Sequence, residues 1–206
     1  MKIYKTVSFI ALIAFSLTLL SFSNGGDSYT LHSKVKDFTL ENVDGNKVAL
    51  SDYKKAKGFI VVFTCNHCPY AKMYESRIMS LDKEYADKGF PVIAISSNDE
   101  KAYPSDSFEN MKKLAKEKGY TFPYLFDATQ EVAKAFGAKK TPHAYVLKKE
   151  GKNITVEYVG AIDDSPRDAS SVRKKYIENA VDELLAGKSV SNNKTIAIGC
   201  GIKWIN

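Results

Sequence analysis

The sequence predicts an α/β fold in which a central mixed sheet is flanked by helices, because patterns typical of buried strands alternate with helical patterns along most of the chain. The clearest strand is GFIVVFT at residues 58–64, a continuous β-branched and aromatic run of the kind buried on both faces of a sheet. The chain has 206 residues, of which 44 % are hydrophobic and 26 % charged. We therefore expect one folded domain with a substantial core and short additions.

An N-terminal β-hairpin extension is expected before this strand. Residues 37–53 contain two short runs of alternating apolar residues around the turn sequence DGN. From residue 66 onward, apolar side chains recur every three or four positions, which predicts a helix closed by Gly89. The strand at residues 58–64 thus leads directly into a helix.

A second strand and helix follow the same order. Residues 90–99 (FPVIAISSND) again have the pattern of a buried strand. The next helix is expected to start near Asp106 or Ser107 and to stop at Gly119. This repetition indicates at least two strands that run parallel.

The rest of the domain is expected to contain two more helices and a hairpin. Asp127 and Gln130 stand in capping-box register at the start of a short helix. Residues 143–162 form two apolar runs around a polar turn, which predicts an antiparallel hairpin that closes the sheet. A last helix is expected over residues 169–186.

The N-terminus has the pattern of an export signal. Lys2 and Lys5 precede an apolar run at residues 7–22, and cleavage after Ser23 would satisfy the preference for small residues. The alternative is an uncleaved membrane anchor. Either way we expect an exported protein, periplasmic or extracellular, in a compartment where disulfides persist. The predicted parts are a signal peptide (1–23), a linker (24–34), the domain (35–187) and a C-terminal tail packed on it (188–206).

The charge of the chain argues against nucleic acid as a partner. Loss of Lys2 and Lys5 with the signal lowers the formal net charge from +6 to +4. The remaining lysine pairs are spread along the chain and are not interleaved with aromatic residues, whereas a nucleic-acid groove needs them on one face.

The chemistry of the chain is expected at Cys65 and Cys68, in the sequence FTCNHCPYAK. The two cysteines lie at the predicted junction of strand and helix, where unpaired backbone N–H groups and the helix dipole favour a thiolate. Cys68 is close enough to attack a mixed disulfide formed by Cys65, and a protonated His67 would further stabilise the thiolate. Pro69 fits the first turn of the helix.

Four segments together resemble a thioredoxin-fold redoxin of the peroxiredoxin-like branch, which is grouped with alkyl hydroperoxide reductase and thiol-specific antioxidant proteins. They are VKDFTLENVDGNKVALSDY, TCNHCPYAK, KKTPHAYVL and GCGIKW, and the resemblance spans residues 35–204. It implies a thioredoxin-like fold in which the bond between Thr141 and Pro142 is cis and faces the cysteines. Thr141 and Pro142 would then contact an extended substrate.

The chain departs from the patterns of both related groups. Thr64 stands where most thioredoxin-like reductases have tryptophan, and no acidic residue lies between Gly58 and Thr64. Neither cysteine has the proline seven residues and the threonine or serine three residues before it that a peroxiredoxin needs. No arginine lies in TPHAYVL; the arginines are Arg77, Arg167 and Arg173.

The sequence therefore predicts an exported thiol-disulfide oxidoreductase. Its redox centre would be a Cys65–Cys68 disulfide with no further cofactor, and its partners would be proteins with thiols or disulfides and a redox partner that recharges it. One alternative is copper binding or delivery by Cys65, Cys68 and His143, and another is a peroxiredoxin-like peroxidase. Cys200 is either a small buried apolar residue or a third redox cysteine.

Overall fold

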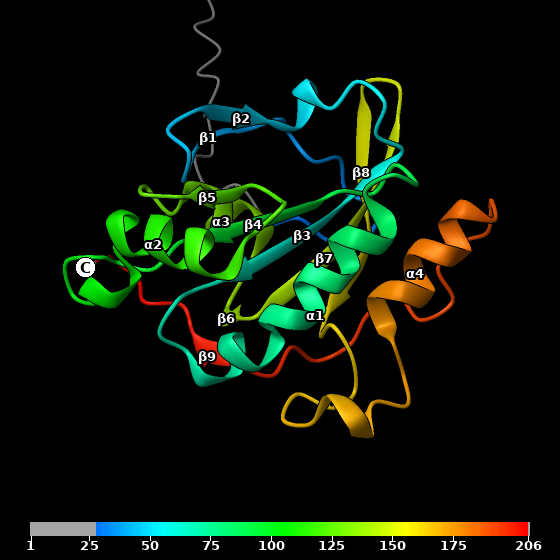
Figure 1. Ribbon diagram of the computed structural model, residues 1–206. Helices are drawn as coiled ribbons and strands as arrows, with labels where there is room; N and C mark the ends of the chain where they lie inside the picture. The colour runs from blue at the N-terminus through cyan, green and yellow to red at the C-terminus, as the bar shows by residue number, and fades with distance from the viewer. Residues whose placement is uncertain (1–27, 206) are drawn as a thin grey trace, which may run out of the picture.

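A seven-stranded mixed sheet forms the centre of the protein, which is represented by a computed structural model that describes residues 28–205 (Figure 1). The strand order is β2-β1-β5-β4-β3-β7-β8. These strands are β1 (Thr39–Asn42), β2 (Lys47–Ala49), β3 (Gly58–Thr64), β4 (Val92–Ser96), β5 (Tyr124–Phe126), β7 (His143–Glu150) and β8 (Asn153–Gly160). A separate small sheet pairs β6 (Lys140–Thr141) with β9 (Cys200–Gly201). The predicted signal peptide lies outside the described residues.

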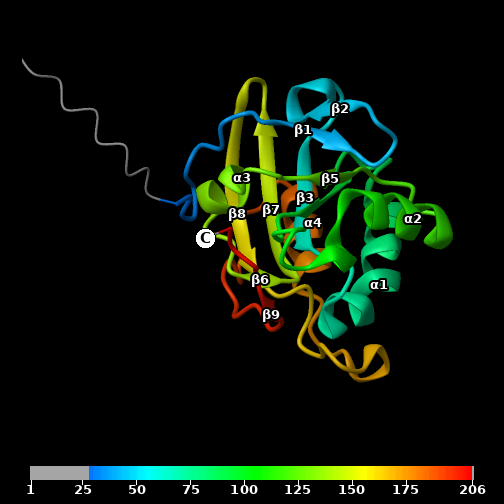
Figure 2. The same ribbon diagram turned by 90° about the vertical axis from the view of Figure 1, so that its left-hand side faces the viewer.

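Four α-helices cover the two faces of the sheet (Figure 2). They are α1 (Pro69–Tyr85), α2 (Phe108–Lys118), α3 (Glu131–Phe136) and α4 (Tyr176–Leu185). Buried side chains of α1, α2 and α4 form the core on one face, and those of α3 form the core on the other. Within residues 28–205, none of these helices is long and apolar enough to cross a membrane.

Strand β3 lies between the two cores and is buried along its whole length. It pairs in parallel with β4 and antiparallel with β7. Its side chains alternate, so that Ile60 and Val62 enter one core and Phe59, Val61 and Phe63 the other. This explains why the sequence of β3 is apolar without interruption, and it fixes the position at which β3 delivers Cys65.

The predicted fold class is confirmed, including the N-terminal hairpin. Strands β1 and β2 pair antiparallel around Gly45, whose φ of +87° favours glycine. Helix α2 starts after Ser107, whose side chain accepts a hydrogen bond from the backbone N–H of Asn110.

Two predicted helix starts are wrong. The last α-helix begins at Tyr176 and not at residue 169, where the chain forms only a short 3-10 helix, Ala169–Ser171. The Asp164 carboxylate accepts the backbone N–H groups of Arg173 and Lys174, which keeps these two residues out of the α-helix. Gln130 does not complete a capping box. Its side-chain amide instead binds the backbone of Ser97, Lys203 and Ile205. The Asp127 carboxylate and the Thr129 hydroxyl accept backbone N–H groups from the first turn of α3.

The described part of the predicted linker packs on the domain. The Tyr29 ring contacts Phe136 edge-on, with 5.2 Å between ring centroids, and its backbone N–H bonds to the Ala135 carbonyl. Lys34 forms a β-bridge with Thr155. These contacts, spread over residues 29–34, join the segment to α3 and β8, so it is not a free connection.

Candidate active site

The site is built where β3 ends and α1 begins. Strand β3 stops at Thr64, Cys65 follows directly, and Cys68 is the residue before the first turn of α1. Both cysteine residues are buried, Cys65 to 3 % exposure and Cys68 to 0 %. The predicted strand-to-helix junction is therefore present, and it places both sulfur atoms beneath the surface at one edge of the sheet.

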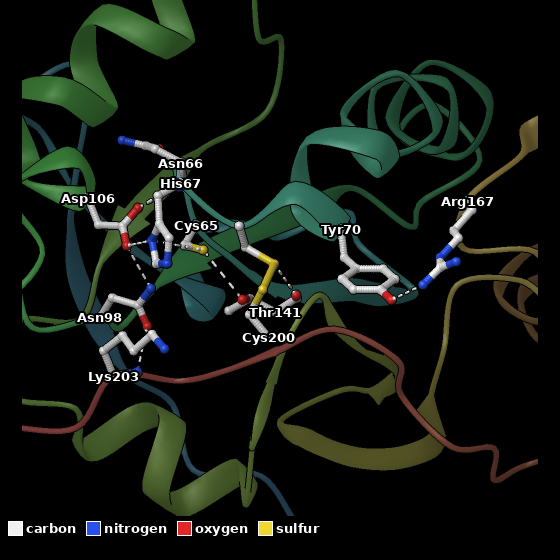
Figure 3. Close-up of a disulfide and its surroundings, with 11 residues drawn as sticks. Cys65, Asn66, His67, Tyr70, Asn98, Asp106, Thr141, Arg167, Cys200 and Lys203 are labelled. Carbon is white, nitrogen blue, oxygen red and sulfur yellow. Dashed lines mark hydrogen bonds and ion pairs between the residues drawn. A yellow bond between two sulfur atoms is a disulfide. The ribbon is translucent and has the colours of Figure 1, made fainter.

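Thr141 contacts both of these sulfur atoms (Figure 3). Cys65 Sγ and Thr141 Oγ1 are hydrogen-bonded at 3.4 Å, and Cys68 Sγ lies 3.1 Å from the Thr141 carbonyl oxygen. The Thr141–Pro142 peptide bond is cis, as the resemblance implies. The structure thus brings together three of the predicted site residues, although they are 73 and 76 positions apart in sequence.

Asp106 holds the loop between the two cysteines and was not predicted as a site residue. Its side chain is fully buried, and one oxygen accepts the backbone N–H groups of Asn66 and His67, each at 2.9 Å. The other oxygen accepts from Asn98 Nδ2 at 2.7 Å and is paired with His67 Nδ1. Four donors thus converge on one carboxylate, which fixes the backbone of the loop.

One signal in the sequence could have pointed to Asp106. Strands β3 and β4 are parallel, so the loops that follow them leave the sheet at the same edge. Asp106 lies in the loop after β4, and the cysteine loop follows β3. An acidic residue between β4 and the next helix was therefore a candidate for contact with the cysteine loop.

His67 is placed by Asp106 and by an aromatic neighbour. Its ring stacks on Tyr103 with 5.2 Å between centroids, and its Nδ1, paired with Asp106, lies 3.9 Å from Cys65 Sγ. His67 is therefore adjacent to the sulfur that it was predicted to tune. Its orientation is set by the buried carboxylate, which the sequence reasoning did not include.

The electrostatics of Cys65 differ from the expectation. Burial raises the pKa of the Cys65 thiol, and the negative charge of Asp106 raises it further. Hydrogen bonds to the sulfur from Thr141 and from the backbone lower the pKa but do not outweigh burial. In this state Cys65 is therefore stabilised as a thiol, whereas the sequence predicted that the helix start would favour a thiolate.

The disulfide in the structure joins Cys68 to Cys200, and Cys65 is a free thiol. This pairing differs from the predicted Cys65–Cys68 bond. The reason is the path of the C-terminal chain, in which β9 pairs antiparallel with β6 and brings Cys200 opposite Thr141. Cys200 packs against the cluster formed by Cys65, Cys68 and Ala71, so all three cysteines share one site.

The structure does not bring together the predicted metal ligands Cys65, Cys68 and His143. His143 Nδ1 accepts a hydrogen bond from the Lys139 backbone N–H at 3.3 Å and lies 3.3 Å from Tyr145 Oη. Burial, together with the charge of Lys139, lowers the His143 pKa to about 4. Within residues 28–205, the group of potential metal ligands that do converge is Cys65, His67 and Asp106.

The model of the AhpC/TSA family matches residues 31–158, which include the sheet except for the end of β8, the cysteine loop and the Thr141–Pro142 pair. The chain belongs to the AhpC/TSA family. Among solved structures, this AhpC/TSA protein is similar to an uncharacterized conserved protein from Geobacillus kaustophilus. The two are 42 % identical with a TM-score of 0.79, over 87 % of this chain and 94 % of the other.

Two further relatives of this AhpC/TSA protein carry thiol-disulfide names. The thiol-disulfide oxidoreductase ResA of Geobacillus thermodenitrificans is 27 % identical over 58 % of this chain and 64 % of its own length, so the match spans less than two thirds of that relative. A thioredoxin-family thiol:disulfide interchange protein from Chlorobium tepidum shares the fold. It is 20 % identical with a TM-score of 0.54, over 68 % of this chain and 93 % of its own.

Proposed function

We propose that this protein is an exported thiol-disulfide oxidoreductase that acts on other proteins through Cys65 and Cys68. The observation that carries the proposal is the convergence of both sulfur atoms on Thr141 at the end of β3. Thiol-disulfide exchange needs a sulfur that attacks, a second sulfur that resolves the mixed disulfide and a place for the substrate chain. Cys65, Cys68 and the Thr141–Pro142 pair take these three roles, and His67 tunes the attacking sulfur.

Export is the second part of the proposal. It is supported by the predicted signal at residues 1–23 and by a disulfide between cysteines 132 positions apart. Structural and catalytic disulfides of this kind persist in oxidising compartments and are rare in the cytosol of mesophiles.

The arginines provide no support for the peroxidase alternative. Arg77 is bonded to Asp163 at 2.7 Å, and Arg167 reaches Tyr70 Oη at 3.2 Å. Neither bond involves Cys65 or Cys68, so these guanidinium groups do not hold an oxygen next to a sulfur in the way that peroxide reduction requires.

The test is an exchange assay on a protein substrate with a disulfide, with the purified chain in glutathione buffer. The Cys65→Ser variant should lose exchange by about two orders of magnitude or more, because Cys65 is proposed as the sulfur that attacks the substrate disulfide. Ser76→Ala, on the exposed side of α1, serves as the control for a single-residue change close to the site and should keep the rate. A Cys65→Ser protein that exchanges as fast as the control would overturn the proposal.

A further inference from the structure

The tail segment, residues 195–205, passes along the edge of β6 next to the cysteines. Thr141 is the register partner of Cys200, and Lys140 that of Gly201. The Ile202 backbone N–H also bonds to the Lys139 carbonyl at 3.2 Å. Main-chain pairing of an extended segment along a strand edge is a common way for proteins to bind peptides. Figure 1 shows β9, in red, beside β6 and the start of α1.

The fit between the tail segment and Thr141 is close at one position. A Cβ atom added to Gly199 would lie 2.2 Å from the Thr141 carbonyl oxygen and 2.7 Å from its carbonyl carbon. A Cβ added to Gly201, on the other side of Cys200, would meet nothing within 4 Å. The site therefore accepts only glycine directly before the cysteine of the docked segment.

A chain of hydrogen bonds connects the tail segment to the cysteine loop. The Lys203 backbone N–H donates to Asn98 Oδ1 at 2.8 Å, and Asn98 Nδ2 donates to Asp106 at 2.7 Å (Figure 3). Asp106 in turn holds the backbone N–H groups of Asn66 and His67. Asp106, which positions the loop, is therefore connected to the docked tail through Asn98.

We propose that the tail segment is an internal substrate, docked where an external cysteine-containing segment binds, and that Cys200 is a third redox cysteine which Cys65 releases from Cys68. This inference rests on the proposed function, because it assigns the docking site and the partner of the same cysteine pair. In the exchange proposed above, Cys65 starts the reaction and Cys68 resolves it, whereas the docked tail is held on Cys68 and Cys65 is the free thiol. The two sulfurs of the pair therefore exchange roles in the internal reaction, with Cys200 in the place of a substrate sulfur.

The reaction that releases the tail is a disulfide isomerisation. Cys65 Sγ attacks Cys68 Sγ, the Cys65–Cys68 bond forms, and the Cys68–Cys200 bond breaks with its electron pair on Cys200 Sγ. The proton lost by Cys65 is taken up by Cys200, so the number of thiols and disulfides is unchanged. The step therefore needs no external oxidant or reductant.

The geometry also defines the class of external substrate. It is an extended segment in which glycine precedes the reactive cysteine, because any other residue would collide with the Thr141 carbonyl group. Such a segment competes with the tail segment for the β6 edge, so release of Cys200 opens the site.

The test compares Gly199→Ala with its matched control Gly201→Ala in the full chain. Each protein is oxidised to one disulfide, quenched in acid and alkylated, and its free thiol is mapped by mass spectrometry. Trp204 is the only tryptophan, so its quenching by acrylamide reports whether the tail segment is docked. For Gly199→Ala, we expect the ratio of Cys65–Cys68 to Cys68–Cys200 to rise about tenfold relative to the control, because overpacking destabilises the docked state. Trp204 should become easier to quench.

A second comparison keeps the proposal falsifiable without an altered tail. The unaltered protein, when reduced, should react about tenfold faster with a glutathione-capped peptide that contains Gly-Cys-Gly than with one that contains Ala-Cys-Gly. Equal disulfide ratios and quenching in the two glycine variants, or equal rates with the two peptides, would overturn the inference. These outcomes would leave the proposed function, Cys65-dependent exchange on a protein substrate, unaffected. The proposed function itself would be wrong if the Cys65→Ser protein kept full exchange activity.

Discussion

The cysteine loop (residues 65–68) and the tail segment meet at the same disulfide but are held by different interactions. The loop is buried, and Asp106 fixes its backbone from inside the protein. The tail segment is held by main-chain pairing with β6, by hydrogen bonds with the Asn98 and Gln130 side chains, by the disulfide and by buried Ile202. Its side chains Ile196, Ile198 and Ile205, however, are 84 %, 47 % and 52 % exposed. In the proposed release of Cys200, Cys68 therefore stays in place within the buried loop, whereas Cys200 leaves with the more exposed tail segment. This asymmetry is what a site for substrates needs.

The largest expected effect concerns the cysteine loop, which Asp106 holds. Asp106→Asn replaces an acceptor of four hydrogen bonds by an amide whose NH₂ group faces some of the same donors. We expect the free energy of unfolding to fall by about 3–5 kcal/mol, as for other buried polar networks that lose one partner. Urea denaturation followed by circular dichroism measures the change.

Asp164→Asn is the matched control for this change. Asp164 also accepts two backbone N–H groups, but it is exposed to solvent. Water can replace the lost bonds there, so we expect a cost below about 1 kcal/mol. Equal losses in the two variants would mean that Asp106 does not fix the loop more firmly than a surface cap does.

The next effect concerns the tail segment and its cysteine, Cys200. Cys200→Ser removes a cross-link that spans 132 positions, and we expect the oxidised protein to lose about 2–4 kcal/mol of unfolding free energy. The measurement is urea denaturation with and without reductant. Under reducing conditions the variant and the unaltered protein should unfold at nearly the same urea concentration. A large difference there would show that Cys200 stabilises the tail by packing and not through the disulfide.

A smaller effect concerns the pH dependence of stability, which we expect to depend on His143, the first residue of β7. The His143 pKa is lowered to about 4, first by burial and second by the charge of Lys139. His143 is therefore neutral in the folded protein at a pH where it would become protonated in the unfolded chain. Its contribution to stability is complete above about pH 6.5 and is lost as the pH falls towards 4. Between pH 7 and 5 we expect a loss of about 1–2 kcal/mol, measured by urea denaturation.

His143→Gln should lack this part of the pH dependence. His32→Gln is the control, because the His32 side chain is 68 % exposed. If the unaltered protein and His143→Gln lose the same stability between pH 7 and 5, another group causes the acid sensitivity.

The smallest expected effect is on the alkylation rate of Cys65 in the docked state. Its pKa is raised by burial and by the charge of Asp106, so little thiolate is present near neutral pH. Alkylation of the Cys68–Cys200 form with iodoacetamide should therefore be slower than that of the unfolded chain. Its rate should continue to rise at pH values where an ordinary thiol has levelled off. If the alkylation rate of Cys65 levels off at the pH of an ordinary thiol, or at a lower pH, burial does not raise the Cys65 pKa.

The local part of the site could be predicted from the sequence, because it depends on neighbouring residues. Strand β3 is uniformly apolar, a helix follows it, and the cysteines lie between them. Asp106 could not be assigned in the same way, because its role comes from the parallel arrangement of β3 and β4. The partner of Cys200 was equally out of reach, since three cysteines permit several pairings and only the path of the tail along β6 selects one.

The most direct test of the central claim is a redox titration of the unaltered protein in glutathione buffers, with rapid alkylation and mapping of Cys65, Cys68 and Cys200. We predict that a Cys65–Cys68 disulfide forms reversibly over the titration and that Cys200 appears as a free thiol in the same molecules. A protein in which Cys65 stays a free thiol at every glutathione ratio, while only Cys68–Cys200 forms, would contradict the account.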